Sequence, residues 1–179
     1  MPASFLTRLL PLALAAALAG CGPDKNEFAP PCPQPSFVRG LDDLTRFRTD
    51  GGRDLTDMLI QGRLVSLNGE CKMVTKKGSL VEATVKITAE FLRGPALLSR
   101  QQDVPVFLAV TDGDTVLDKQ LFLVPVNFPS NVDRLVLTSP EMRLVLPSTP
   151  TKSPAAFGIV AGFQLSPAEL GANRQRVGQ

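Results

Sequence analysis

Residues 80–91 read LVEATVKITAEF, and this stretch decides the fold. From Val81 to Phe91 every second residue is apolar, and the residues between them are Glu, Thr or Lys. Successive side chains of a β-strand point to opposite faces, so this alternation gives the strand one buried face and one face in water. The stretch therefore predicts a long antiparallel strand lying against a hydrophobic core.

Turn signals lie on both sides of this strand. Asn68-Gly69 follows an apolar run at residues 57–67 and is the pair best suited to a type I′ hairpin turn. We therefore expect residues 70–75 to pair back on that run. Lys76-Lys77-Gly78 predicts a second turn into the long strand, and Arg93-Gly94-Pro95 predicts its end.

Further strands are predicted downstream, where short runs rich in branched and aromatic residues alternate with turn signals such as Asp112-Gly113-Asp114. These runs are residues 104–111, 115–128, 134–137, 142–146 and 156–165. Pro105 and Pro125 should lie at sheet edges or bulges, because proline has no N–H to donate. Ser166-Pro167-Ala168-Glu169 is a capping box that predicts a short helix through about Asn173.

The predicted fold class is all-β. About seven short strands without a long helical period are typical of an immunoglobulin-like antiparallel β-sandwich, here with a short C-terminal helix. A closed barrel is the alternative. The chain has 179 residues, of which 44% are hydrophobic, and this composition fits a single β-rich domain over residues 37–179.

Residues 1–20 have the layout of a signal peptide. Arg8 precedes an apolar run, and from Leu9 to Pro23 there are 15 residues without a charge. A membrane-spanning helix needs about 20 apolar residues, so a transmembrane anchor is the weaker interpretation.

Leu18-Ala19-Gly20-Cys21 resembles the lipobox of bacterial lipoproteins, in which the cysteine thiol receives the lipid. This resemblance implies lipidation at Cys21 and permanent attachment to a membrane. Gly22 follows the cysteine where some lipoproteins have Asp, which by analogy favours the outer membrane, facing the periplasm. The alternative is an ordinary secretory peptide that is cleaved after Gly20.

Residues 21–36 form the lipidated N-terminus and a tether. Five prolines fall between residues 22 and 36, and such a segment should be extended and stiff. If Cys21 is acylated, Cys32 and Cys71 remain, and an exported compartment allows them to form a disulfide. Two separate thiols, buried or reactive, are the alternative.

Composition argues against several classes of function. The chain contains no His, which removes the commonest general base and zinc ligand, so we expect no catalytic residues, no metal and no cofactor. The formal charge of +2 provides no field to attract a nucleic acid. Asp112, Asp114 and Asp118 superficially resemble a calcium loop but lack its other ligands, so a solvated turn is expected.

Residues 41–58 are rich in charge and contain three arginines among five aspartates. Arg46, Arg48 and Arg53 would face a partner protein if this loop were an interaction surface, since Arg is enriched at interface hot spots. Ion pairing within the loop is the alternative.

The chain also resembles an uncharacterised lipoprotein family of alphaproteobacteria. The resemblance covers nearly all of the domain and is carried by residues 43–47, 51–56, 93–96, 106–112, 162–165, 169–170 and 173–174. It implies a lipid-anchored envelope protein with a β-rich periplasmic domain and implies no activity. We expect a non-catalytic envelope lipoprotein that binds or scaffolds another envelope protein. The alternative is a periplasmic module that binds a small ligand or glycan, although ten Phe without Trp or Tyr argue mildly against a glycan.

The lipoprotein interpretation predicts that Cys21→Ser releases the chain from its lipid. The variant should lose its resistance to high-salt washing of membranes or migrate as an unprocessed species on gels, whereas a Cys71→Ser control should behave as the natural chain does. A Cys21→Ser variant that stays on washed membranes with unchanged migration would refute lipidation.

Overall fold

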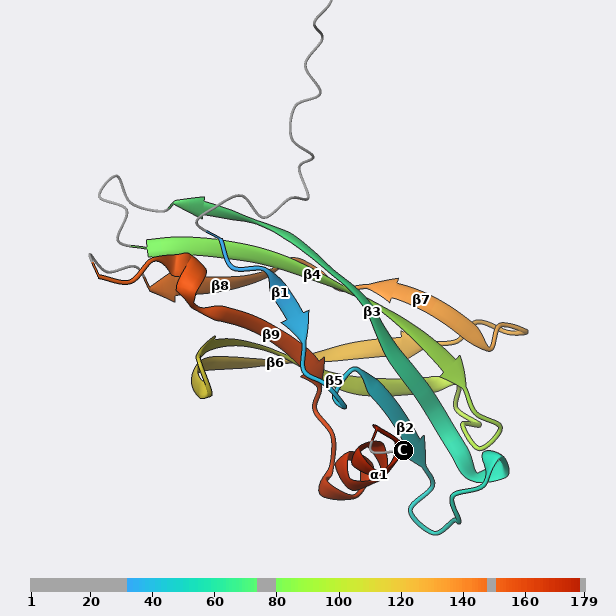
Figure 1. Cartoon of the computed structure of the whole chain (residues 1–179). Helices are drawn as coiled ribbons and strands as arrows, with labels where there is room; N and C mark the ends of the chain where they lie inside the picture. The colour runs from blue at the N-terminus through green and yellow to red at the C-terminus, as the bar shows by residue number, and fades with distance from the viewer. Residues whose placement is uncertain (1–31, 74–79, 148–150, 178–179) are drawn as a thin grey trace, which may run out of the picture.

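The computed structural model describes residues 32–73, 80–147 and 151–177, and in these residues nine strands form two sheets (Figure 1). The first sheet has the order β1 (Pro35–Phe37), β9 (Gly158–Phe163), β5 (Gln101–Asp112), β6 (Thr115–Asn127). The second contains β2 (Asp43–Phe47), β3 (Met58–Met73), β4 (Leu80–Arg93), β7 (Arg134–Thr138) and β8 (Met142–Pro147). The described helical segments are η1 (Leu55–Asp57), η2 (Pro154–Ala156) and α1 (Pro167–Val177). The predicted all-β sandwich with a C-terminal helix is confirmed.

The decisive strand β4 lies where its alternation predicted. Its apolar residues from Val81 to Phe91 point into the core, and each is at most 5% exposed. Phe91 meets Phe163 of the other sheet edge to face, with ring centroids 6.2 Å apart. A Cβ at Gly62 would lie 3.0 Å from both rings, so this glycine lets the two sheets approach.

The hairpin predicted at Asn68-Gly69 is wrong. Strand β3 runs straight through these residues, which pair with Lys86 and Val85 of β4, and residues 70–73 continue the same strand. The inner face of β4 is apolar along its whole length, so a continuous partner buries more of it than a short hairpin would. A bulge at residues 64–66 changes which positions of β3 face inward, so that Leu67 after the bulge lies on the same inner face as Leu64 before it. The turn predicted at residues 76–78 lies outside the described residues.

Two strands were missed because their composition hid them. Strand β1 pairs parallel to β9 and begins inside the segment expected to be tether, where proline content predicted no strand. Strand β2 pairs antiparallel to β3 and lies in the segment expected to be a charged loop. Both are short edge strands, and the ladder of β1 depends on a partner far away in the sequence.

The prediction for Pro125 is confirmed, whereas Pro105 lies in the interior strand β5 and not at a sheet edge or bulge. Pro125 lies on β6, the edge strand of its sheet, and Pro105 lies one residue before the part of β5 that pairs with β9. Gly113 has a φ of 56° in the predicted turn between β5 and β6.

Strands β7 and β8 run in one direction along the same edge of β4. Between them the Ser139 hydroxyl accepts a hydrogen bond of 3.0 Å from the Ile87 N–H, and the Ser139 N–H donates 2.9 Å to the Ile87 carbonyl. Pro140 follows and has no N–H for the ladder. The edge is therefore one long strand interrupted at Ser139-Pro140.

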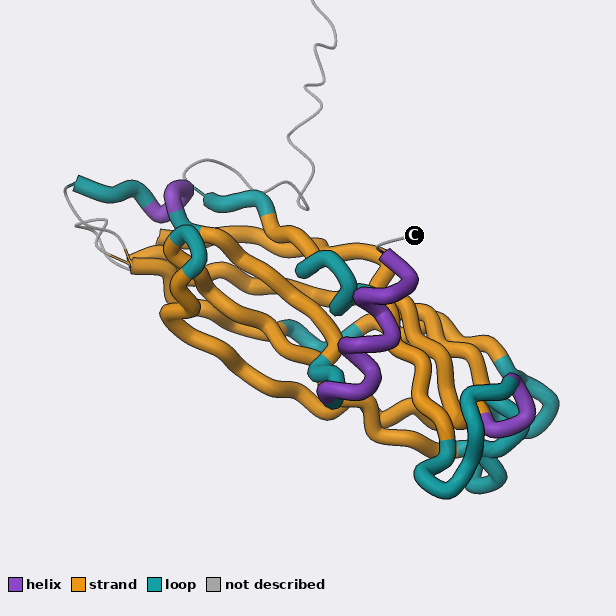
Figure 2. Tube along the Cα trace, turned by 60° about the horizontal axis from the view of Figure 1, so that its bottom comes forward, coloured by secondary structure: helices purple, strands orange, loops and turns teal. Residues whose placement is uncertain are grey.

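Helix α1 begins at the predicted capping box and extends beyond Asn173. The Ser166 N–H donates 2.7 Å to the Glu169 carboxylate, and the Glu169 N–H donates 3.3 Å to the Ser166 hydroxyl. The helix packs against β2 (Figures 1 and 2), where the buried Asn173 amide donates to the carbonyls of Gly40 and Asp43. Among the described residues, no helix has the length and apolar character needed to span a membrane.

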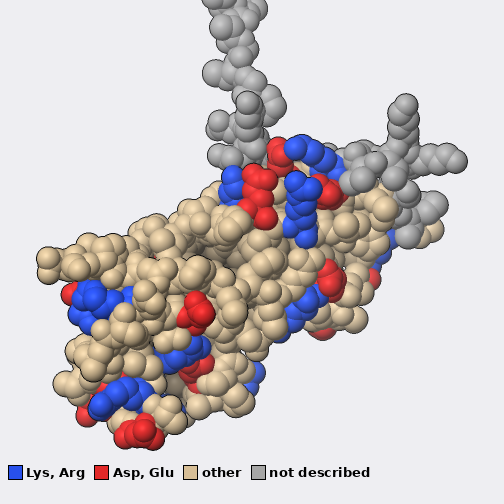
Figure 3. Space-filling model, turned by 180° about the vertical axis from the view of Figure 1, so that it is seen from behind, with Lys and Arg blue, Asp and Glu red and all other residues tan. Residues whose placement is uncertain are grey.

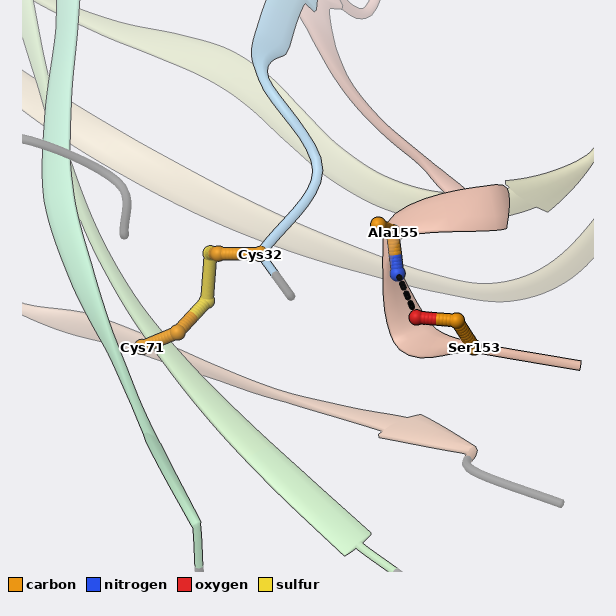
Figure 4. The surroundings of a disulfide bond; sticks show 4 residues. All are labelled: Cys32, Cys71, Ser153 and Ala155. Atoms are coloured by element: carbon orange, nitrogen blue, oxygen red, sulfur yellow. Dashed lines mark hydrogen bonds between the residues drawn. A yellow bond between two sulfur atoms is a disulfide. The ribbon is translucent and has the colours of Figure 1, made fainter. Parts of the chain in front are cut away.

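One side of the sandwich is closed covalently. Cys32, just before β1, is bonded to Cys71 of β3, with Cα atoms 5.9 Å apart (Figure 4), so the predicted pair lies at disulfide distance. The chain then crosses between the sheets after β1. The Phe163 N–H donates 2.7 Å to the Leu41 carbonyl of this crossing, and the Leu64 N–H donates 2.8 Å to that of Asp42.

Removing the disulfide should loosen this closed side. For a sequence separation of 39 residues, the chain-entropy relation gives a loss of about 4 kcal/mol in the free energy of unfolding. We expect this loss in a Cys32→Ala/Cys71→Ala variant by urea denaturation, and reductant should then have no further effect. Free alkylation of both thiols in the non-reduced natural chain would contradict the prediction.

Candidate functional site

An apolar cleft of about 720 Å³ lies between the two sheets on the side opposite the disulfide. There β6 forms the edge of the first sheet, and β7 and β8 form the edge of the second. In the described residues β6 pairs with β5 alone, so no ladder joins the two edges. The lining consists of Ile87, Ala89, Val106, Leu121, Phe122, Leu123, Val124, Pro125, Leu137, Thr138, Ser139, Pro140, Glu141 and Met142.

The wall from the first sheet comes from β5 and β6. Val106 lies opposite Phe122 in the ladder, so both side chains share the inner face. Val106 is buried, whereas Phe122 and Val124 on the edge strand are half-buried. The core is therefore closed to solvent at β5 and becomes accessible to solvent at the neighbouring edge strand β6.

The wall from the second sheet is a continuation of the core. Ile87 and Ala89 of β4 are buried, and Leu137 of β7 lies opposite Ala89 on the same inner face. Met142, at the start of β8, is buried beside the interruption between β7 and β8. Methionine adapts its shape easily to a neighbouring apolar group. This wall therefore presents a smooth aliphatic surface with one adaptable side chain.

The polar groups at the rim are already paired. The Ser139 hydroxyl donates 2.9 Å to the Pro140 carbonyl as well as accepting from Ile87. The Thr138 hydroxyl lies 3.1 Å from that of Thr88, and Glu141 is paired with Lys86 at 3.1 Å. Within the described residues, no buried side-chain polar atom lacks a hydrogen bond. The lining can bind apolar surface, and its described residues offer a ligand no buried side-chain polar atom that lacks a hydrogen bond.

Large apolar side chains along the same two edges are also exposed to solvent. Leu121 and Leu123 of β6 are 62% and 68% exposed, and Val136 of β7 and Val145 of β8 are 62% and 54% exposed. Leu121 and Leu123 lie on the outer face of the first sheet, and Val136 and Val145 lie on the outer face of the second.

The three predicted site arginines do not gather on one surface. Arg46 lies in β2 and pairs with Glu169 of α1 at 2.9 Å, so the loop assignment was wrong for this residue. Arg48 pairs with Asp57, and Arg53 is exposed. The Arg48–Asp57 pair lies within residues 41–58 and fits the alternative of ion pairing within this segment, whereas Arg46 pairs outside it, with Glu169 of α1.

Two carboxylates in these pairs have shifted pKa values. The Arg48 guanidinium holds the pKa of Asp57 below its usual value, and burial opposes this effect only in part. Burial would raise the pKa of Glu169, but hydrogen bonds from the Ser166 N–H and from Arg46 outweigh it and lower the pKa below 4.5. Both groups are therefore anionic at neutral pH, as their ion pairs require.

None of the other predicted residues that the structure describes lines the cleft. Cys21 lies outside the described residues, and Asp112 of the supposed calcium loop pairs with Lys152 at 2.5 Å. The described part of the chain holds no cluster of three or more residues that could ligate a metal. Charged side chains of both signs are interspersed on the face shown in Figure 3, so neither sign dominates it.

Comparisons with protein-family models, with curated proteins and with solved structures found no match. The resemblance to a lipoprotein family and the lipid anchor on Cys21 therefore stay predictions.

Sequence reasoning missed the cleft, although one signal for it was present. Residues 121–126 read LFLVPV, which is apolar on both faces of a strand. Pro125 within the run indicates an edge strand. An edge strand that is apolar on both faces needs a cover, and this combination could have indicated an open side of the sandwich.

The Arg46–Glu169 pair should stabilise the docking of α1. A double-mutant cycle with Arg46→Met and Glu169→Gln should give a coupling energy of about 1 kcal/mol at pH 7, because both side chains are mostly buried. The pKa of Glu169 is lowered in the folded state, so this contribution is present above pH 4.5 and lost as the pH falls through the folded pKa.

Urea denaturation at pH 7 and pH 3 measures this coupling. The exposed Arg63–Asp43 pair, whose side chains are 69% and 36% exposed, is the control and should show coupling near zero. Equal coupling of the Arg46–Glu169 pair at the two pH values would contradict the proposed electrostatic role.

Proposed function

We propose that this protein is a non-catalytic binding module of the bacterial cell envelope. In this proposal a lipid on Cys21 anchors it to the outer membrane on the periplasmic side, and the apolar cleft holds a small apolar ligand. Of the two functions expected from the sequence, the cleft favours the small-ligand module over the protein scaffold. The observation that carries the proposal is an aliphatic cleft built on regular strands and open between two unpaired edges.

The dimensions and lining of the cleft support ligand binding. Its volume of about 720 Å³ lies within the range of about 300–1,000 Å³ that is typical of small-molecule sites. Its walls come from four strands, β4 to β7, and from the start of β8, so their geometry exists before a ligand arrives. Apolar surface removed from water contributes about 25 cal/mol per Å², which makes an apolar ligand the natural occupant.

A glycan fits this lining poorly. Phe122 is the one aromatic side chain among the lining residues, and the rim hydroxyls of Thr138 and Ser139 are already engaged. A sugar buried here would leave its own hydroxyls without partners, at a cost in free energy for each. The proposal is therefore restricted to apolar ligands.

A second candidate function is the scaffold expected from the sequence. Leu121 and Leu123 point outward from an edge strand whose outer ladder is open in the described residues. An extended segment of another envelope protein could add to this edge by β-augmentation, with apolar side chains over the two leucines.

The proposal is tested by filling the cleft. We expect one saturable site for an uncharged naphthylamine dye, measured by fluorescence, and about tenfold weaker binding in a Val124→Phe/Leu137→Phe variant, equivalent to about 1.4 kcal/mol. Val136→Phe is the matched control, because Val136 neighbours Leu137 on β7 but pairs with Glu90 on the outer face. Loss of dye binding in the control as well, or no change in the filled variant, would refute binding in the cleft.

A further inference from the structure

The shape of the cleft selects among apolar ligands. Its lining follows β6 from Leu121 to Pro125, which corresponds to roughly 13 Å along a strand at about 3.3 Å per residue. Across this direction the two sheets of a sandwich lie about 10 Å apart, and inward side chains from both walls occupy much of that distance. The space is therefore long and narrow, which favours a linear chain over a fused-ring compound.

The chemistry of the lining further restricts which ligands can bind in the cleft. The deep part is formed by Ile87, Ala89 and Val106, which are buried and carry no polar side-chain atom. The one charged lining residue is Glu141 at the rim, and it is paired with Lys86. A ligand with a charged or hydrogen-bonding group in the deep part would leave that group unpaired, so any polar end must stay outside.

From this shape and lining we propose that the cleft binds one aliphatic chain of a lipid, with the polar end of the lipid left in water beside residues 138–141. The inference rests on the proposed function and names its ligand class. The cleft opens lengthwise between β6 and the β7–β8 edge, so a chain can enter sideways without threading through a closed barrel.

An aliphatic chain could come from two sources. One is a lipid of the surrounding membrane, and the other is the acyl group predicted on Cys21 of the same protein. Cys32 lies eleven positions after Cys21, and an extended segment of eleven steps reaches about 36 Å. The first sheet is four strands wide, or about 14 Å at roughly 4.8 Å per spacing. The segment from Cys21 to Cys32 is therefore long enough for an acyl group on Cys21 to reach the cleft from the disulfide side.

The absence of Trp and Tyr from the chain allows a direct test. Phe122→Trp places a single indole in the cleft, and Val136→Trp places one on the outer face of β7, outside the lining. Each substitution is made in the mature chain, residues 21–179, with Cys21→Ser and exported behind an ordinary secretory signal. The probe is dibromostearic acid, whose bromine atoms quench indole fluorescence on contact.

We expect saturable quenching of the Phe122→Trp chain, at least about twofold stronger than that of the Val136→Trp chain, since a bound ligand is mostly enclosed by its site. Unbrominated palmitate should reverse it. Equal quenching of the two chains would overturn the inference. If the naphthylamine dye binds the cleft but dibromostearic acid does not quench, the acyl-chain inference fails and the proposed function stands; if neither binds, both fail.

The source of the chain is then identified with the lipidated protein. The Phe122→Trp chain with Cys21 intact is placed in vesicles of phosphatidylcholine with brominated acyl chains, beside the matching Cys21→Ser chain. Stronger quenching than in the Val136→Trp control for both chains supports binding of a membrane lipid. Quenching of the Cys21→Ser chain alone supports occupation of the cleft by the protein's own acyl group. No excess quenching in either chain overturns the inference for bilayer lipids and for the anchor.

Discussion

The two sheets are joined by a disulfide and a crossing of the chain on one side, whereas on the other side no ladder joins their edges in the described residues, and the rest of the structure depends on this asymmetry. The Cys32–Cys71 bond, the crossing after β1 and the docking of α1 all lie on the side of β1, β2 and β3. On the other side, the described residues hold no strand that bridges β6 to β7 or β8. A sandwich clamped at one side keeps its sheets in register while its other side stays open, without loss of the core.

The strands at the open side carry features that limit the pairing of sheet edges with other chains. Proline lies on both edges of the cleft, at Pro125 within the continuous strand β6 and at Pro140 between β7 and β8. Each proline removes one donor and so limits uncontrolled pairing with another chain. Lys119 of β6 covers the Phe107 ring at 4.6 Å from its centroid, which shields part of the outer face.

The electrostatic contacts serve the same architecture. Arg46 reaches from β2 to Glu169 of α1, and the same carboxylate caps the helix through the Ser166 N–H. One buried acidic group thus fixes both the start of the helix and its position on the sheet. Arg46 and Glu169 are therefore engaged within the domain, and the apolar edges are better candidates for contact with a partner.

The sequence by itself determined what depends on neighbouring residues. The alternation in residues 80–91, the turn at Gly113 and the capping box before α1 follow from local periodicity and backbone chemistry, and the structure has all three. These features need no knowledge of distant partners. A Cys32–Cys71 disulfide was one of two alternatives that the sequence left open, and the structure places the two residues at disulfide distance.

Only the tertiary structure decided what depends on long-range pairing. Asn68-Gly69 has strong local preference for a turn, yet the apolar face of β4 holds it in a continuous strand. Its neighbours in the sequence predict that Arg46 is an exposed charge, but α1, which lies far along the chain, supplies Glu169 as its ion-pair partner. The cleft exists because two sheet edges do not pair, and a local pattern cannot specify which edges remain unpaired, since that outcome is set by the competition among all strands for partners.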